Sequence, residues 1–489
     1  MKNKKMMYPL LLLCCALLAS CGDTAASPAA GETEPASAEI VTETEEVTEK
    51  TLYRSAELLG TYDFGGAEYH ILGREYAKLG DLPAMEFTVE GENGDLINDT
   101  VFKRNRIVEE QYNVSVTSEQ GAVSLAEKSV LAGDGAYDLI WAHINDMSSL
   151  ATKGVLSDYY TLPVIDITQP WWNQLATQSL TVNGRCYLQM NYIPFTGVLL
   201  SHCLYFNKTI AAEYDLENCY DLVKNNGWTF DKFSALAKTV SRDVDGNGVF
   251  DDKDFYGVLA SHGTSGAAFS IAMDVKAVKI HEDGTFDLIL SSDRNQSILA
   301  KIVDLMSDPS AYLITDYAKE NDLARMFAAD QALFYSGFLT DSYQFFRAME
   351  SDFGLLPFPK YDESQSAYIT TITGGTGLLG IPRVVADEEK TGVITEALAM
   401  ESYNYVYPAI YDTVFEDKVL RDEDSMEMFD ILMNGMEIDF GRTFKYGQYT
   451  DLFCDLVAKK SSDLMSAAAK QEKGAVKAYQ KVIDTYYKD

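Results

Sequence analysis

Positive charge is scarce in this chain of 489 residues, where 40 Lys and Arg residues face 74 Asp and Glu residues and the formal net charge is −34. Nucleic acids and anionic membrane surfaces are bound through basic patches. The sequence therefore argues against both kinds of partner. The high acidic content indicates a solvated surface and does not by itself identify a ligand.

Long apolar runs are also scarce. One occurs near the N-terminus, over residues 6–18. It is too short to span a bilayer, which requires about 20 apolar residues. Lys2, Lys4 and Lys5 precede it, as in the positive region of a secretory signal. We therefore expect residues 1–20 to be a signal peptide and the mature chain to have no membrane span.

The signal ends in Leu-Ala-Ser-Cys-Gly over residues 18–22. This stretch resembles the lipobox of bacterial lipoproteins, in which the signal is cleaved before a cysteine that carries a diacylglycerol. We expect Cys21 to be that lipid site, so that lipid anchors the protein to the extracytoplasmic face of the cell membrane. A plain signal peptide with an accidental cysteine is the alternative.

Residues 21–55 consist mostly of Ala, Ser, Thr, Pro and Glu, and no aromatic residue occurs among them before Tyr53. Such a segment cannot bury enough apolar surface to offset its ordering entropy. We expect a disordered, acidic tether with a reach of roughly 30 Å as a coil. The body that follows, residues 56–489, is long enough for two or more domains.

Cysteine is sparse in that body. Two of the seven cysteines lie in the signal and one is the expected lipid site. The remaining four are Cys186, Cys203, Cys219 and Cys454. Four cysteines in so large a body do not make a disulfide framework. One disulfide and buried free thiols both remain open.

Catalytic motifs are missing as well. The five His residues are scattered, without HExxH or zinc spacing. Residues 262–266 miss the spacing of a nucleophile elbow by one position. Residues 375–380 match the dinucleotide fingerprint, but Pro382 follows and leaves no helix N-terminus for a pyrophosphate. The many acids prevent exclusion of a glycosidase pair by counting, although nothing positive indicates one.

Short apolar runs alternate with amphipathic stretches along the body. Residues 69–73, 113–117 and 137–141 are typical of strands, whereas residues 95–112 and 230–241 have helical spacing. From about residue 392 the pattern is mostly helical. Strands that alternate with helices indicate an α/β architecture.

The sharpest local motif is an EF-hand-like loop over residues 243–254. Calcium prefers six to eight oxygen ligands, and Gly248 permits the turn that makes them converge. Position 12 of the loop is Asp254 rather than Glu, and a strand pattern follows instead of a second helix. We expect one structural calcium ion, with an acidic turn without metal as the alternative. The expected ligands are Asp243, Asp245, Asn247, Val249 (through its carbonyl), Asp251 and Asp254.

Five further stretches carry a resemblance to a known family: residues 136–143, 204–208, 225–233, 327–338 and 355–360. Together they resemble the extracellular solute-binding proteins of ABC importers, specifically the carbohydrate-binding group that includes maltodextrin-binding protein. The resemblance covers about residues 60–489. Phe338 stands where that group often has a Trp that stacks on the ligand.

The resemblance implies a two-lobed, type II periplasmic-binding-protein fold with a ligand cleft between the lobes. Lobe one would comprise residues 56–197 and 368–412, and lobe two residues 198–367 and 413–489. The implied protein is a monomer that binds a carbohydrate and delivers it to ABC permease subunits, without catalysis. The alternative from a different functional class is a surface glycan adhesin or glycan-degrading enzyme, which the missing catalytic motifs disfavour.

Cleft residues follow from the same resemblance. It implies ligand contacts by Trp141, Asn145 and Asp146 from lobe one and by Phe338 from lobe two. For Trp171 and Trp172, a ligand-binding and a structural role are equally compatible with the sequence.

Overall fold

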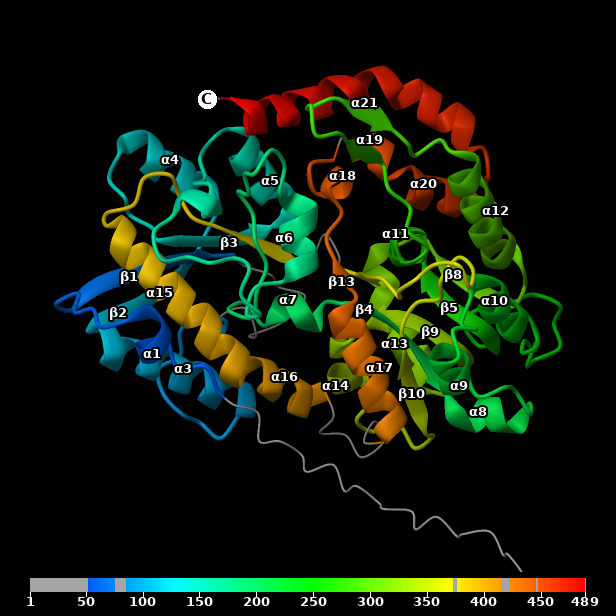
Figure 1. Cartoon of the computed structure of the whole chain (residues 1–489). Coiled ribbons are helices and arrows are strands. Elements are labelled where there is room, and N and C mark those ends of the chain that lie inside the picture. The colour runs from blue at the N-terminus through cyan, green and yellow to red at the C-terminus, as the bar shows by residue number, and fades with distance from the viewer. Residues whose placement is uncertain (1–51, 75–84, 373–375, 415–421, 446, 489) are drawn as a thin grey trace, which may run out of the picture. The chain divides into compact units, whose positions relative to one another are not determined.

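The computed structural model describes residues 52–74, 85–372, 376–414, 422–445 and 447–488. The expected signal peptide, the lipid site Cys21 and the tether up to residue 51 lie outside the described residues. By its contacts, the chain from Leu52 to Asp489 forms one compact unit. Two sheets organise this unit (Figure 1).

The first sheet has the strand order β12-β3-β1-β2, in which β1 pairs in parallel with β2 and β3 while β12 runs antiparallel to β3. We call this sheet and the helices packed on it the first lobe. Its strands are β1 (Ala67–Gly73), β2 (Val114–Gln120), β3 (Leu139–His143) and β12 (Gly377–Gly380). Its helices are α1 (Ser55–Leu59), α3 (Leu96–Tyr112), α4 (Ser124–Ala132), α5 (Ile144–Thr152), α6 (Gln174–Leu180) and α15 (Glu388–Glu401), with the 3-10 turn η2 (Tyr159–Thr161).

Helix α3 shows how local sequence signals set an element of this lobe. Asp95 caps it by accepting the backbone N–H of Asn98, and Asn113 ends it in the left-handed region at φ 50°. Val101 and Val108 lie on its buried face. The expected helix over residues 95–112 and the strands on either side of it are therefore present.

The second sheet has the order β10-β4-β9-β5-β8, in which β9, β5 and β8 are parallel and β4 is antiparallel to both of its neighbours. With its helices it forms what we call the second lobe. Its strands are β4 (His202–Asn207), β5 (Tyr256–Ser261), β8 (Ala311–Ile314), β9 (Ala332–Phe338) and β10 (Phe353–Leu356). β4, β5 and β10 are buried at every position, as expected of strands covered on both faces.

The helices of the second lobe include one whose start the sequence predicts. Thr229 caps α10 by accepting the backbone N–H of Lys232, and Phe233 and Ala237 face the core. The helices are α8 (Lys208–Glu213), α9 (Cys219–Lys224), α10 (Phe230–Lys238), α11 (His262–Ala272), α12 (Asp293–Ser307), α13 (Glu320–Ala328), α14 (Thr340–Phe345), α17 (Glu423–Asn434), α19 (Gly447–Thr450) and α20 (Leu452–Ala458), with η3 (Tyr317–Lys319). A small hairpin, β6 (Val278–Ile280) and β7 (Phe286–Leu288), extends from this lobe.

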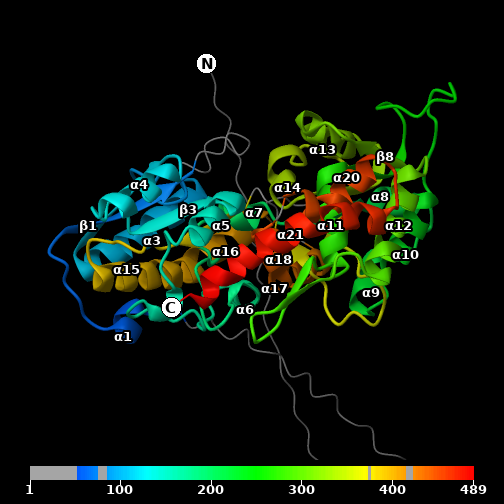
Figure 2. The ribbon, with the colours of Figure 1, turned by 90° about the horizontal axis from the view of Figure 1, so that it is seen from above.

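Several segments cross between the lobes. One is α7 (Thr196–Leu199), and a second is β11 (Thr370–Thr371), which pairs in parallel with β13 (Met436–Glu437) before the short helix α18 (Phe440–Thr443). A third is α15 continued through the π-helical turn η4 (Ser402–Val406) into α16 (Tyr407–Val414). Figure 2 shows α7 and α18 between the two groups of elements.

The C-terminal helix α21 (Leu464–Tyr487) touches both lobes and is about 36 Å long at 1.5 Å per residue. Near its start, the backbone N–H of Leu464 donates to Gln296 Oε1 of α12 at 3.2 Å. Near its end, Asn183 Nδ2 of the first lobe donates to the carbonyl oxygen of Tyr486 at 3.2 Å. Figures 1 and 2 both show the helix lying across the two groups of elements.

The first described residues belong to the folded unit rather than to a tether. Tyr53 donates its backbone N–H to Asn404 Oδ1 at 3.1 Å, and Asn404 Nδ2 donates to the carbonyl oxygen of Tyr53 at 2.6 Å. Ser55 is 1% exposed, and its hydroxyl donates to Glu401 at 3.0 Å. The prediction placed residues 52–55 in the tether because amino-acid composition contains no information about these hydrogen bonds to distant parts of the chain.

Trp171 and Trp172 have a structural role in the first lobe. Both are buried, and their indole N–H groups donate to the two carboxyl oxygens of Glu396 on α15 at 2.7 and 3.1 Å. Burial raises the pKa of Glu396 from 4.5 to about 7, against the opposing effect of the two indole bonds. These contacts support the structural role of the two Trp residues and contradict the ligand-binding alternative.

Replacing Glu396 by Gln should change how stability depends on pH. Between pH 4.5 and 7 the native wild-type protein binds a proton at Glu396 that the unfolded chain has released, so wild-type stability falls as pH rises through this window. Relative to Glu396→Gln, the wild type should lose up to about 3 kcal/mol between pH 5 and pH 8, measured by denaturant unfolding.

Glu388→Gln is the matched control, since Glu388 is an exposed acid in the first turn of the same helix. Its stability difference from wild type should stay nearly constant over this pH range. A constant difference for Glu396→Gln as well would contradict the raised pKa.

Candidate functional site

A cavity of about 410 Å³ lies where the strands of the second lobe end. β5, β8 and β9 are parallel, so their carboxyl ends share one edge of the sheet, and the first residue of the antiparallel β4 lies at the same edge. The segment after β3 in the first lobe lines the opposite wall. Ligands of open α/β sheets bind outside the carboxyl ends of strands, so this is the expected place for a site.

Crossing segments form one side of the cavity. His202 follows α7, Thr371 and Ile372 belong to the segment of β11, and Glu437 and Ile438 belong to that of β13. Residues that contact a ligand here would therefore be attached to the chain segments that join the lobes.

Phe338, a predicted cleft residue, lines this cavity at the end of β9. Its backbone N–H donates to Asp341 Oδ2 at 2.8 Å, which fixes the strand end. His202, itself 2% exposed, lies against the Phe338 ring with a centroid distance of 4.6 Å and an interplanar angle of 34°. The half-buried phenyl ring is thus held in place by the imidazole beside it and lines the cavity with an apolar surface.

Tyr317 is a second aromatic residue of the cavity, and sequence reasoning missed it. It follows β8 at the start of η3, is 57% exposed, and has its ring centroid 4.8 Å from that of His262. A Cβ at Gly263 would lie 2.1 Å from Tyr317 Oη, so the ring rests directly on this glycine. Burial of its hydroxyl, with Cys454 and Glu320 nearby, raises the pKa of Tyr317 to about 12.

The first lobe contributes His143 and the predicted residue Asn145. His143 Nδ1 accepts the backbone N–H of Asn145 at 3.1 Å and so caps α5. Burial, followed by Arg74, lowers the pKa of His143 and so favours the neutral ring. With Nδ1 accepting, the proton lies on Nε2, and the ring can donate one hydrogen bond. Asn145 is exposed beside it.

Trp141 is not part of the cavity lining. It is 1% exposed within β3, with the Arg74 guanidinium 4.7 Å from its ring centroid and the Phe87 ring at 5.9 Å. A Cβ at Gly377 of the adjacent β12 would lie 2.3 Å from Trp141 Nε1. The predicted stacking role is therefore corrected, because both faces of this central strand are covered.

Asp146 also points elsewhere. It lines a separate hollow of about 540 Å³ together with Arg74 and His143. Of the four main cleft residues predicted, the structure thus brings Asn145 and Phe338 to one cavity and leaves Trp141 and Asp146 outside it. The pattern of residues 136–146 locates the cavity wall correctly but cannot tell which side chains reach it.

The remaining lining is polar and mixed in charge. Thr371, Thr443 and Thr450 supply hydroxyl groups. The acidic members are Glu320, Glu437, Asp439 and Asp451, and the basic members are Arg442 and Lys445. Two of the acids have lysine partners: Lys445 Nζ lies 3.3 Å from Asp451 Oδ2, and Lys276 pairs with Glu437. Such a lining offers donors and acceptors together with flat apolar rings.

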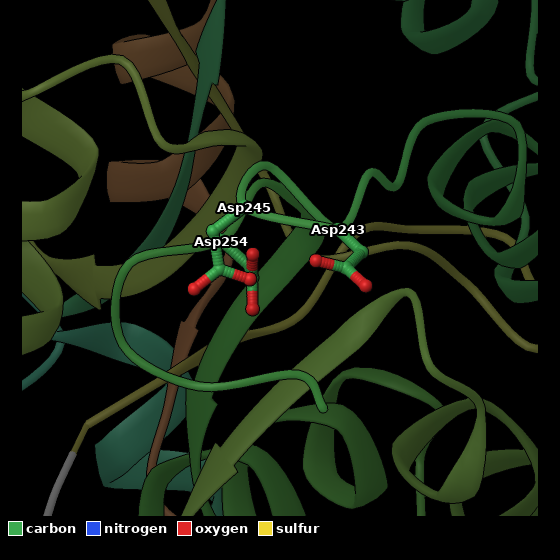
Figure 3. Close-up of side chains that lie close together, drawn as sticks. All are labelled: Asp243, Asp245 and Asp254. Atoms are coloured by element: carbon green, nitrogen blue, oxygen red, sulfur yellow. The ribbon is translucent and has the colours of Figure 1, made fainter. Parts of the chain in front are cut away.

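The predicted calcium loop lies at the other end of β5 from the cavity. Arg242 and Phe255 exchange backbone hydrogen bonds at 3.0 and 3.1 Å and so close the loop at its base. Carboxylate oxygens of Asp243, Asp245 and Asp254 lie within 4.8 Å of one another. Figure 3 shows the three side chains extending toward the same space.

Backbone geometry explains this convergence. Gly248, at φ 79°, donates its N–H to Asp243 Oδ2 at 2.7 Å, and this bond is the main reason for the lowered pKa of Asp243. Asp254, 1% exposed, accepts the backbone N–H groups of Val244 and Asp251, both at 2.8 Å. The other three expected ligands, Asn247, Val249 and Asp251, belong to the same loop but not to this carboxylate cluster.

The four cysteines of the body are free thiols. Cys186, Cys203 and Cys219 are buried, and Cys454 lines the cavity, with its thiol 3.4 Å from the carbonyl oxygen of Gly263. Of the two alternatives left open by the sequence, one disulfide or free thiols, the structure has free thiols. Among the helices of the described ranges, none has the length and apolarity needed to cross a membrane.

Comparison with known proteins gives a family match. A model described as "Bacterial extracellular solute-binding protein" matches residues 106–403, which is more than half of the chain. No curated protein sequence matches the chain. The predicted resemblance to extracellular solute-binding proteins is confirmed by this match.

Solved structures with the same fold include two substrate receptors. The ABC substrate-binding protein Lmo0181 from Listeria monocytogenes, in complex with cycloalternan, is 14% identical with a TM-score of 0.52. The GacH receptor of Streptomyces glaucescens GLA.O, solved unliganded and with acarbose, is 11% identical with a TM-score of 0.54. Each comparison covers 84% of this chain and 98% of the other. These structures confirm the predicted α/β, two-lobed fold.

Proposed function

Since the chain belongs to the bacterial extracellular solute-binding proteins, we propose that it captures a carbohydrate in the cavity between its lobes and delivers it, as a monomer, to the permease subunits of an ABC transporter. The observation that carries the proposal is the cavity itself. It combines the Phe338 and Tyr317 rings with amide, hydroxyl and carboxyl groups at the facing strand ends.

The chemistry of this lining suits a sugar. A pyranose has apolar ring faces that pack on aromatic rings and hydroxyl groups that need both donors and acceptors. Phe338 and Tyr317 supply the rings, and Asn145 supplies an exposed amide. The cycloalternan and acarbose bound by the two solved receptors support the same ligand class.

A binding protein accounts for the chain better than the alternatives. The matched family consists of solute-binding proteins and not of enzymes, so a glycan-degrading activity has no support from it. An adhesin would require no coupling to a permease, whereas a cavity bounded by crossing segments is suited to a protein whose lobes move when a solute binds.

A thermal-shift screen against maltose, cellobiose, acarbose and cycloalternan tests the function. A bound sugar should stabilise the protein by about 2.7 kcal/mol at a hundredfold excess over its Kd. Phe338→Ala should weaken binding about tenfold, because it removes the ring that the sugar face packs on. Phe345→Ala is the matched control, since Phe345 is also half-buried but lies outside the cavity. Binding of peptides or metal chelates, with no response to any glycan, would refute the ligand class.

We also propose that the 243–254 loop binds one calcium ion. The three converging carboxylates fit a hard cation, and the remaining oxygens of the loop could complete its coordination. The loop is about 20 Å from the cavity along β5, at roughly 3.3 Å per residue, so the ion would be structural.

EDTA should therefore lower the melting temperature of the wild type, because removing the cation leaves the three carboxylates to repel one another. Asp245→Ala should abolish that sensitivity. Asp252→Ala should keep it, because Asp252 is an exposed acid of the same loop outside the expected ligand positions. No shift with EDTA, together with no metal in mass spectrometry of the wild type, would mean that the loop is a turn without calcium.

The lipid anchor is the third part of the proposal. An extracellular family fits the exported lipoprotein that the sequence of residues 18–22 indicates, with Cys21 as the modified residue and palmitate among its acyl chains. Anchoring would keep the protein beside its membrane partner.

Cys21→Ser should abolish metabolic labelling with palmitate and move the protein into the medium, or leave it unprocessed, because the thiol is the acceptor of the lipid. Labelling and fractionation of intact cells measure both effects. Unchanged labelling would show that Cys21 is not the lipid site.

A further inference from the structure

Two cations line the cavity, and they differ in their surroundings. Lys445 is in an ion pair with Asp451 at 3.3 Å. Arg442, in contrast, forms no ion pair with any carboxylate in the described part of the chain. Arg442 is half-buried in the cavity lining, where a few placed polar groups fix how a ligand binds.

The carboxylate next to Arg442 already has other partners. Asp439 is buried, and its Oδ1 accepts the backbone N–H of Arg442 at 2.8 Å rather than the guanidinium. Lys276 acts on the same carboxylate electrostatically, and this lysine also pairs with Glu437. Arg442 also acts electrostatically on Asp439 and on Cys454, which lines the same cavity. Its guanidinium therefore lies at the cavity wall without a carboxylate in ion-pair contact in the described part of the chain.

The backbone that carries Arg442 is held from three sides. Asp439 caps α18, and the hydroxyl of Thr443 donates back to the carbonyl oxygen of Asp439 at 2.9 Å. Tyr479 of α21 donates its hydroxyl to the carbonyl oxygen of Gly441 at 2.7 Å. A Cβ at Gly441 would lie 3.0 Å from Val278 Cγ1. The position of Arg442 relative to the cavity wall is therefore well defined.

We propose that Arg442 is a specificity-determining residue of this cavity, where its guanidinium donates to two adjacent hydroxyl oxygens of an uncharged saccharide. The inference rests on the proposed function and narrows its ligand class. A guanidinium presents parallel N–H groups in a fixed planar fork, which matches two neighbouring acceptors; an ammonium does not.

Charge around the site favours an uncharged ligand over a uronate. The lining contains four acids and two bases, and Lys276 adds one further positive charge behind Glu437. A carboxylate on the sugar would meet Arg442 but would also lie near Asp439 and the other acids, where repulsion is poorly screened. The net charge of −34 for the whole chain adds to this repulsion.

The test compares wild type with Arg442→Lys, which keeps the charge and loses the fork. Calorimetric Kd values are measured for maltose and cellobiose, for monodeoxy analogues of each, and for the corresponding glucuronic-acid disaccharides. Wild type should bind a neutral disaccharide about 10- to 100-fold more tightly than Arg442→Lys. One monodeoxy analogue should bind less well than its parent to wild type but equally well to the variant.

Arg325→Lys is the control. It is the same substitution, made at an exposed arginine that pairs with Asp322 and does not line the cavity. It should bind the neutral disaccharides as wild type does. The melting temperature of ligand-free Arg442→Lys should match that of wild type, which separates a role in recognition from a role in folding.

Three results would overturn the inference. Equal binding of a neutral disaccharide by wild type and Arg442→Lys would remove Arg442 from recognition while leaving the proposed function intact. Tighter binding of a glucuronic-acid disaccharide than of its neutral counterpart would refute the uncharged ligand. No binding of any of these probes or of cycloalternan by wild type would refute the proposed function itself, and the inference with it.

Discussion

The cavity depends above all on strand direction in the second sheet. Because β5, β8 and β9 run parallel while β4 runs against them, three carboxyl ends and one amino end meet at the same edge. The antiparallel register makes His202 the direct partner of Phe338, which brings the two rings together. A register shift of one residue would turn Phe338 to the other face of the sheet and remove the aromatic wall.

Features with local causes were predictable from sequence. The calcium-like loop follows from spacing within twelve residues, and Phe338 follows from the family resemblance of the local stretch 327–338. The prediction for Trp141 failed because burial of this residue depends on Gly377, more than 200 residues away. This glycine lets β12 approach the indole. Tyr317 and Arg442 left no signal, because each lies in a short turn whose position is set by contacts with Gly263 or Tyr479 from elsewhere in the chain.

Two buried ionisable residues of α15 contact other parts of the first lobe. Lys390 of α15 pairs with Asp138 at 3.0 Å, and Glu396 of the same helix accepts from two indoles. Removing one partner of such a pair leaves a buried charge alone, which costs more than the intact pair contributes. These contacts therefore specify one position of α15 on the first sheet, and α15 continues directly into the crossing segment η4–α16.

The two ends of β5 serve different needs. The amino end of β5 follows the 243–254 loop, which Arg242 and Phe255 close. Backbone N–H groups of that loop donate to the carboxylates of Asp243 and Asp254. The carboxyl end passes straight into α11, whose first turn carries Gly263 beneath Tyr317. The six residues of β5 are buried at every position, and close packing of this kind resists small shifts and transmits strain. The strand therefore holds the loop and the cavity wall in a fixed relation, without any contact between the loop and a ligand.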